Sequence, residues 1–113
     1  MLSAKLKKDI LASLKSLNLY KIILFGSYAY GNPGEDSDID LYVIIDDNTL
    51  PNNFDEKIKL KLMVSEKLLD FRMLHPVDLI VHTRLMNEKF NALNSSFSKE
   101  IRNKGICLYE KVS

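Results

Sequence analysis

Four runs of hydrophobic residues, separated by turn-forming residues, divide the chain and predict four β-strands. The runs cover residues 20–25, 38–45, 77–82 and 106–110. The first two are apolar almost throughout, which is typical of strands that are covered on both faces of a sheet. Between these two stands Asn32-Pro33-Gly34, a strong turn signal.

Apolar residues at intervals of three and four predict helices between the strands. Residues 4–17 show this spacing and should form an amphipathic helix packed on the sheet, with Leu6, Ile10, Leu14 and Leu17 inward. Residues 28–30 should be briefly helical, and two short helices should follow the third strand, over residues 84–93 and 95–104. Gly105 stands where a helix often ends in a left-handed residue.

A longer helix is predicted over residues 54–73. Asn53 can cap its first turn, and Pro76 prevents its continuation. Four lysines along it should form a solvated face. The expected core positions are Phe54, Ile58, Leu62, Leu69 and Met73.

Length, charge and cysteine content narrow the class of protein. With 113 residues the chain fits one domain, residues 1–113. Its 16 basic and 15 acidic residues give a net charge of +1, which is not the basic footprint of a nucleic-acid-binding protein. The single Cys107 excludes an internal disulfide, and no apolar run approaches the length of about 20 residues that spans a bilayer. We therefore expect a soluble cytoplasmic protein.

The candidate chemistry lies in residues 26–41, GSYAYGNPGEDSDIDL. In an extended strand Asp38 and Asp40 point to the same face, with their Cα atoms roughly 6.6 Å apart. Two ionised carboxylates this close repel each other unless a cation lies between them, which favours a divalent ion such as magnesium. The Gly26-Ser27 turn can approach a phosphate closely. The segment therefore predicts a site for a nucleotide and a metal ion.

Three other motifs for phosphate or metal fail at definite positions. A P-loop needs Lys and Ser or Thr where the chain has Asn32-Pro33, and no dinucleotide-binding glycine pattern occurs. A calcium loop beginning at Asp36 would need glycine and glutamate where the chain has Leu41 and Asp47.

The pair Gly26-Ser27 followed by Ser37-Asp38-Ile39-Asp40-Leu41 resembles the signature of the DNA polymerase beta-like nucleotidyltransferase superfamily. Within it the chain is most similar to the minimal nucleotidyltransferase (MNT) group. The resemblance implies an α/β (α+β) fold, with a mixed sheet of about four strands flanked by helices. It also implies magnesium-dependent transfer of a nucleoside monophosphate from an NTP, most readily AMP from ATP.

The same resemblance assigns roles to individual residues. Asp38 and Asp40 would bind two magnesium ions together with a third acid on a later strand, for which Asp78 is the candidate. Gly26, Ser27 and Ser37 would contact the nucleotide. In the MNT group the partner is often a HEPN protein, and the pair can act as a toxin-antitoxin system in which the MNT protein adenylylates the toxin. A homo- or hetero-oligomer is compatible with this implication.

The chain departs from the family pattern directly after Gly-Ser. MNT-like sequences often carry arginines there, whereas this chain has Tyr28 and Tyr30. Their rings either pack on the sheet edge or on a partner, or stack on a base. Arg84 and Lys104 are alternative sources of positive charge for the triphosphate. Without such charge, a non-catalytic module that regulates a partner by binding is the alternative function.

Overall fold

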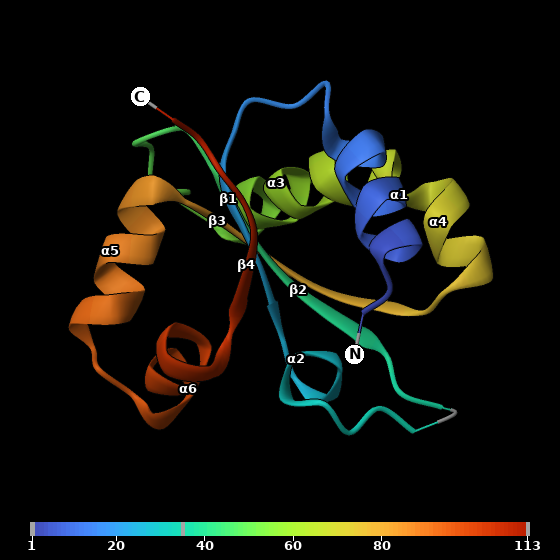
Figure 1. Cartoon of the computed structure of the whole chain (residues 1–113). Coiled ribbons are helices and arrows are strands. Elements are labelled where there is room, and N and C mark those ends of the chain that lie inside the picture. The colour runs from blue at the N-terminus through green and yellow to red at the C-terminus, as the bar shows by residue number, and fades with distance from the viewer. Residues whose placement is uncertain (1, 35, 113) are drawn as a thin grey trace.

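The computed structural model describes residues 2–34 and 36–112 and contains a single mixed sheet flanked by helices (Figure 1). The strand order is β3-β2-β1-β4, in which β2 and β3 pair in parallel and the other neighbours are antiparallel. The strands are β1 (Leu19–Phe25), β2 (Ile39–Ile45), β3 (Val77–Thr83) and β4 (Ile106–Glu110). The helices are α1 (Ala4–Leu14), α2 (Ser27–Tyr30), α3 (Phe54–Lys67), α4 (Leu69–Leu74), α5 (Arg84–Ala92) and α6 (Ser96–Lys104).

The two faces of the sheet are covered by different helices, which explains why β2 is apolar almost throughout. Figure 1 shows α1, α3 and α4 on one side of the sheet and α5 and α6 on the other. Leu41 and Val43 of β2 belong to the core cluster that includes residues of α1, α3 and α4. Tyr42 and Ile44 belong to the second cluster, with Ile101 of α6. The predicted fold class is confirmed.

Side-chain caps begin several helices as the sequence predicts. The side chain of Asn53 accepts a hydrogen bond from the Glu56 N–H at 2.9 Å, and Ser95 accepts one from the Ser98 N–H at 3.1 Å. Helix α1 is shorter than predicted and ends at Leu14 rather than at residue 17. Leu17 nevertheless packs against the core from the following turn.

The predicted long helix is interrupted, and its predicted core face is wrong. Leu68 leaves the helical conformation with φ −94° and ψ 6°, so that α3 and α4 are separate helices. The buried side chains are Val64, Leu68 and Phe71. The five residues expected in the core are instead exposed, namely Phe54, Ile58, Leu62, Leu69 and Met73.

Gly105 is also misassigned, because its φ of −66° is not left-handed. Its lack of a side chain serves packing instead. A Cβ there would lie 2.3 Å from the carbonyl oxygen of Ile101 and 2.6 Å from Cγ2 of Ile23. Glycine therefore lets the end of α6 approach β1 closely.

Within the described residues, no helix combines the length and the apolar character that crossing a membrane requires.

Candidate functional site

The two central carboxylates lie on neighbouring parallel strands. Asp40 of β2 is the register partner of Asp78 of β3, and Phe25, at the end of β1, is the partner of Asp40 on its other side. Register partners direct their side chains to the same face of a sheet, so Asp40 and Asp78 share the face that α5 and α6 cover farther along. Asp38 precedes β2 by one residue, two positions before Asp40.

The pKa of Asp40 shows that the charges of the other two acids act on its carboxyl group. Burial raises the pKa of the Asp40 carboxyl, and the charges of Asp78 and then Asp38 raise it further. Asp38 and Asp78 themselves are exposed. A carboxyl that is destabilised by its acidic neighbours is a favourable ligand for a cation, which removes the repulsion.

The three acids by themselves do not complete the coordination sphere of a metal ion. Within residues 2–34 and 36–112, no three acidic, histidine or cysteine side chains converge closely enough to hold an ion by themselves. Magnesium is usually bound by one or two carboxylates, with water and substrate phosphates completing its coordination. The donor set therefore fits magnesium that arrives with a nucleotide.

The Gly26 turn is built around Asp40. Gly26 has a φ of +71°, which favours glycine, and a Cβ on it would lie 1.9 Å from Oδ2 of Asp40. The turn leads directly into α2, where the carbonyl of Gly26 accepts hydrogen bonds from the N–H groups of Ala29 and Tyr30. The Gly-Ser turn and the acidic pair are thus neighbours, as the motif predicts.

The two predicted serines occupy different positions. Ser27 is the first residue of α2, next to Gly26. The hydroxyl oxygen of Ser37 accepts a hydrogen bond from the Gly34 N–H at 2.7 Å and so fixes the turn that leads to Asp38. That role does not use its hydroxyl hydrogen, which is free to donate to a ligand.

The tyrosines after Gly-Ser lie on opposite sides of α2. Tyr28 packs against the core cluster of the α1 face, so its packing prediction is confirmed. The Tyr30 ring lies under the ammonium group of Lys104, at 5.7 Å from Nζ to the ring centroid. Burial raises the pKa of Tyr30, followed by the nearby carboxylate of Glu100. No sequence motif indicates Glu100, because only the packing of α6 brings it there.

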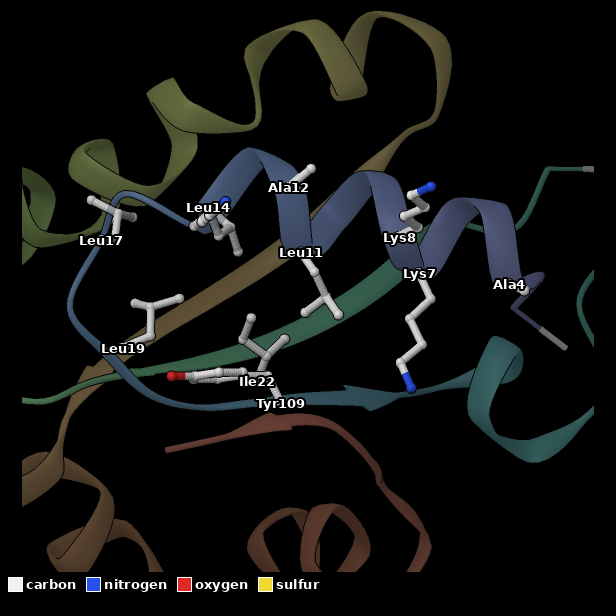
Figure 2. Close-up of a pocket in the computed structure, with 11 residues that line it drawn as sticks. Ala4, Lys7, Lys8, Leu11, Ala12, Leu14, Leu17, Leu19, Ile22 and Tyr109 are labelled. Atoms are coloured by element: carbon white, nitrogen blue, oxygen red, sulfur yellow. The ribbon is translucent and has the colours of Figure 1, made fainter. Parts of the chain in front are cut away.

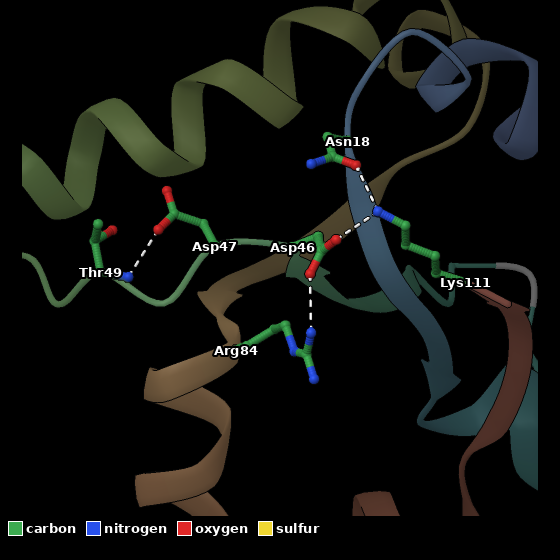
Figure 3. A network of polar contacts seen from close by, with 6 residues as sticks. All are labelled: Asn18, Asp46, Asp47, Thr49, Arg84 and Lys111. Carbon is green, nitrogen blue, oxygen red and sulfur yellow. Dashed lines mark hydrogen bonds and ion pairs between the residues drawn. The ribbon is translucent and has the colours of Figure 1, made fainter. Parts of the chain in front are cut away.

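Arg84 belongs to a polar network at the C-terminal end of β2, away from Asp40 (Figure 3). Its guanidinium bonds to Asp46 at 3.1 Å and lies 4.3 Å from the centroid of the Tyr20 ring. Lys111 bonds to the second oxygen of Asp46 at 2.6 Å and to Asn18 at 3.2 Å. Asp46 directly follows β2 and is six residues from Asp40, so Arg84 is not a triphosphate ligand.

A groove of about 580 Å³ lies elsewhere, beside α1 (Figure 2). Leucines and the Tyr109 ring line it, with lysines along α1, and no acidic residue contributes to it. It opens on the α1 face of the sheet, opposite to Asp40 and Asp78. The groove therefore does not belong to the acidic site.

Comparison with known proteins gives the same assignment as the geometry. The family described as "Polymerase beta, Nucleotidyltransferase" matches residues 8–113. Two proteins of Methanocaldococcus jannaschii, both named as protein adenylyltransferases, are similar to the chain. One is 32% identical over 100 residues, covering 88% of both chains. The other is 40% identical over 85 residues, covering 71% of this chain and 79% of the relative.

A solved toxin-antitoxin structure with AMP-PNP resembles the fold. It has a TM-score of 0.60 and 25% identity, and the match covers 93% of this chain and 73% of that one. The chain belongs to the polymerase beta nucleotidyltransferase family and is a nucleotidyltransferase.

Proposed function

We propose that the protein transfers AMP from magnesium-bound ATP to a hydroxyl group of a partner protein. The observation that carries this proposal is the register pairing of Asp40 with Asp78 beside the Gly26 turn. The names of the two archaeal relatives support a protein as the acceptor. The AMP-PNP complex of a similar fold supports an adenine nucleotide.

Asp38, Asp40 and Asp78 would hold the metal, as two magnesium ions according to the family resemblance. When bound, magnesium neutralises phosphate charge and favours deprotonation of the attacking hydroxyl. The protein supplies position: β2 and β3 fix the spacing of the carboxylates through their hydrogen-bonded register. Gly26, Ser27 and Ser37 would contact the triphosphate.

The reaction forms a bond between the acceptor oxygen and the α-phosphorus of ATP. The bond between the α- and β-phosphates breaks, pyrophosphate leaves, and the proton of the hydroxyl is released. Such a transfer requires mainly positioning and neutralisation of charge. The three carboxylates and the glycine turn would provide the positioning, and the magnesium that the carboxylates hold would neutralise the phosphate charge.

The partner would be a toxin of the HEPN class, with this chain as its antitoxin. This part of the proposal follows from the MNT resemblance and from the toxin-antitoxin structure of similar fold. The names of the archaeal relatives as protein adenylyltransferases support a separate protein that presents the acceptor hydroxyl.

The proposal is tested by mass spectrometry of a candidate HEPN protein after incubation with this chain, ATP and magnesium. The expected result is a gain of one or more AMP units on the partner. Asp40→Asn and Asp78→Asn should each abolish the gain. Asp70→Asn removes the same charge from an exposed position on α4 and should leave the gain unchanged. A mass gain with Asp40→Asn equal to that of wild type would overturn the assignment of the site.

A stable complex with unchanged masses would instead select the alternative function, a module that regulates its partner by binding. The observation that favours this alternative is the pair of tyrosines, Tyr28 and Tyr30, where the family often carries arginines. A mass gain on this chain itself would identify self-modification.

A further inference from the structure

The Gly-Ser turn lacks the adjacent arginines that would balance the charge of a triphosphate. The three arginines of the chain are already bonded to other groups, and Arg72 donates to the hydroxyl of Ser65 at 2.6 Å. Arg84 and Lys111 bind Asp46, and Arg102 binds Asn94 at 2.6 Å. Positive charge near the turn must therefore come from a residue that packing brings there.

Lys104 is such a residue. It is the last residue of α6, and its ammonium group lies 5.7 Å from the centroid of the Tyr30 ring. Tyr30 is the last residue of the one-turn helix α2, and its N–H donates to the carbonyl of Gly26 at 3.1 Å. Figure 1 shows α6 beside α2, although the two helices are separated by more than 60 residues in the sequence.

The surroundings of Tyr30 link Lys104 to the acidic site. The carboxylates of Glu100 and Asp40 are both close enough to raise the pKa of Tyr30, after burial, which has the largest effect. The Tyr30 hydroxyl is buried and has no hydrogen-bond partner among the described residues. Glu100 and Lys104 are four residues apart, so they lie on the same face of α6. This face of α6 therefore borders the Gly-Ser turn and Asp40.

Lys104 is also free to meet a ligand. Lys104 is exposed, and within residues 2–34 and 36–112 its ammonium group forms no ion pair or hydrogen bond and contacts the tyrosine ring. An aromatic face attracts an ammonium group without consuming its hydrogen-bond donors. The three N–H donors of the ammonium remain available, and lysine is a common binder of phosphate oxygens.

We propose that Lys104, supported by the Tyr30 ring, binds phosphate oxygens of the nucleoside triphosphate in place of arginines after Gly26-Ser27. The positive charge is thus supplied by the end of α6 rather than by α2. This inference rests on the proposed function only for the identity of the ligand. It adds a residue that the signature motif does not contain.

Calorimetric titration of the full chain with magnesium and an ATP analogue that carries a methylene group between its α- and β-phosphates tests the proposal. The analogue prevents transfer, so affinity is measured without turnover. Lys104→Gln should weaken binding of the analogue at least about tenfold and change AMP binding by less than about twofold. Lys104→Arg keeps the charge and should bind the analogue within about threefold of wild type.

Lys99→Gln is the matched control, because Lys99 is an exposed lysine on a different face of the same helix. It should bind the analogue as wild type does. Equal affinities of wild type and Lys104→Gln would overturn the role of Lys104 and leave the proposed function standing. Equal weakening by Lys99→Gln and Lys104→Gln would also overturn it, since it would show only a general effect of charge. Absence of binding by wild type would overturn both proposals.

Discussion

The carboxylate of Asp40 rests against Gly26, in space that the side chain of any other amino acid would occupy. A Cβ at residue 26 would lie 1.9 Å from Oδ2 of Asp40 and 2.9 Å from its Cγ. Glycine is therefore needed there for two reasons, its φ of +71° and the position of a proposed metal ligand. The Gly-Ser turn and the Asp-x-Asp strand form one unit.

Gly26→Ala should lower the rate of AMP transfer by about 100-fold or more, because displacement of a reacting group by about 1 Å can have that effect. It should also reduce the free energy of unfolding by about 1–3 kcal/mol, because a φ of +71° with a ψ of −160° is a conformation that essentially only glycine adopts. Transfer assays and thermal unfolding measure the two effects. Gly31→Ala is the control, since Gly31 has a φ of +90° but nothing within 4 Å of an added Cβ. Gly31→Ala should lose stability and retain AMP transfer. If Gly31→Ala lost as much transfer activity as Gly26→Ala, the proposed dependence of transfer on the position of the Asp40 carboxylate would be wrong.

Asp40→Asn should stabilise the metal-free protein while abolishing transfer. The raised pKa means that folded Asp40 binds a proton more readily than unfolded Asp40, so its ionisation opposes folding as the pH rises above about 3.8. Solvent screens the partly exposed group, and we expect Tm to rise by about 2 °C at pH 7 in EDTA.

The control is how the Tm difference between wild type and Asp40→Asn depends on pH and on magnesium. Because the pKa of Asp40 is raised, lowering the pH protonates the folded wild type before the unfolded chain, so the two Tm values should converge as the pH falls. Magnesium should raise the Tm of wild type more than that of Asp40→Asn. A lower Tm for Asp40→Asn at pH 7 in EDTA would show that the acids do not repel one another.

Asp46→Asn should destabilise the protein at neutral pH, because it removes the acceptor shared by Arg84 and Lys111 (Figure 3). Hydrogen bonds from Lys111 and then Arg84 lower the pKa of Asp46. Its stabilising effect is therefore present above the pKa of the unfolded state and is lost as the pH falls through the lower folded value. Thermal unfolding should show a lower Tm for the variant at pH 7 and nearly equal values at about pH 2. A difference that persists at that pH would point to packing rather than to charge.

Tyr30→Phe should raise the thermal stability of the nucleotide-free protein. The Tyr30 hydroxyl is buried, and no described residue lies in good hydrogen-bonding geometry to it, although the carboxylate of Glu100 is close enough to raise its pKa. A buried hydroxyl without a well-aligned partner costs about 1–3 kcal/mol. Recovering about 1 kcal/mol would raise Tm by about 4 °C in a domain of about 100 residues. Thermal unfolding of wild type and Tyr30→Phe measures this change. A decrease in Tm would show that the Tyr30 hydroxyl forms a hydrogen bond in solution.

Local patterns predict the strands well, because each strand depends on neighbours in sequence. The period of two along a strand places Asp38 and Asp40 on one face, and the run after Pro76 identifies the strand of Asp78. The direct pairing of Asp40 with Asp78 depends on strand register instead. No feature of either strand alone fixes that register.

The predictions for α3 and α4 failed for a physical reason. Apolar residues occupy two faces of this segment, so periodicity alone does not decide which face meets the sheet. Val64 is buried before the break at Leu68 and Phe71 is buried after it, while Leu62 and Met73 face outward. The contact between Lys104 and Tyr30 has no local signal either, since it arises only when α6 packs beside α2.

The parallel pairing of β2 with β3 also determines when the protein can become active. The antiparallel strands β1 and β2 bring Gly26 and Asp40 together across the connection that contains α2. Asp78 arrives only after α3 and α4 have been added to the chain. Contacts between distant parts of a chain form slowly compared with local ones. On the ribosome, a nascent chain that has not yet emerged beyond β3 lacks Asp78 of the proposed site, so we expect nucleotide transfer to begin only after β3 has paired with β2.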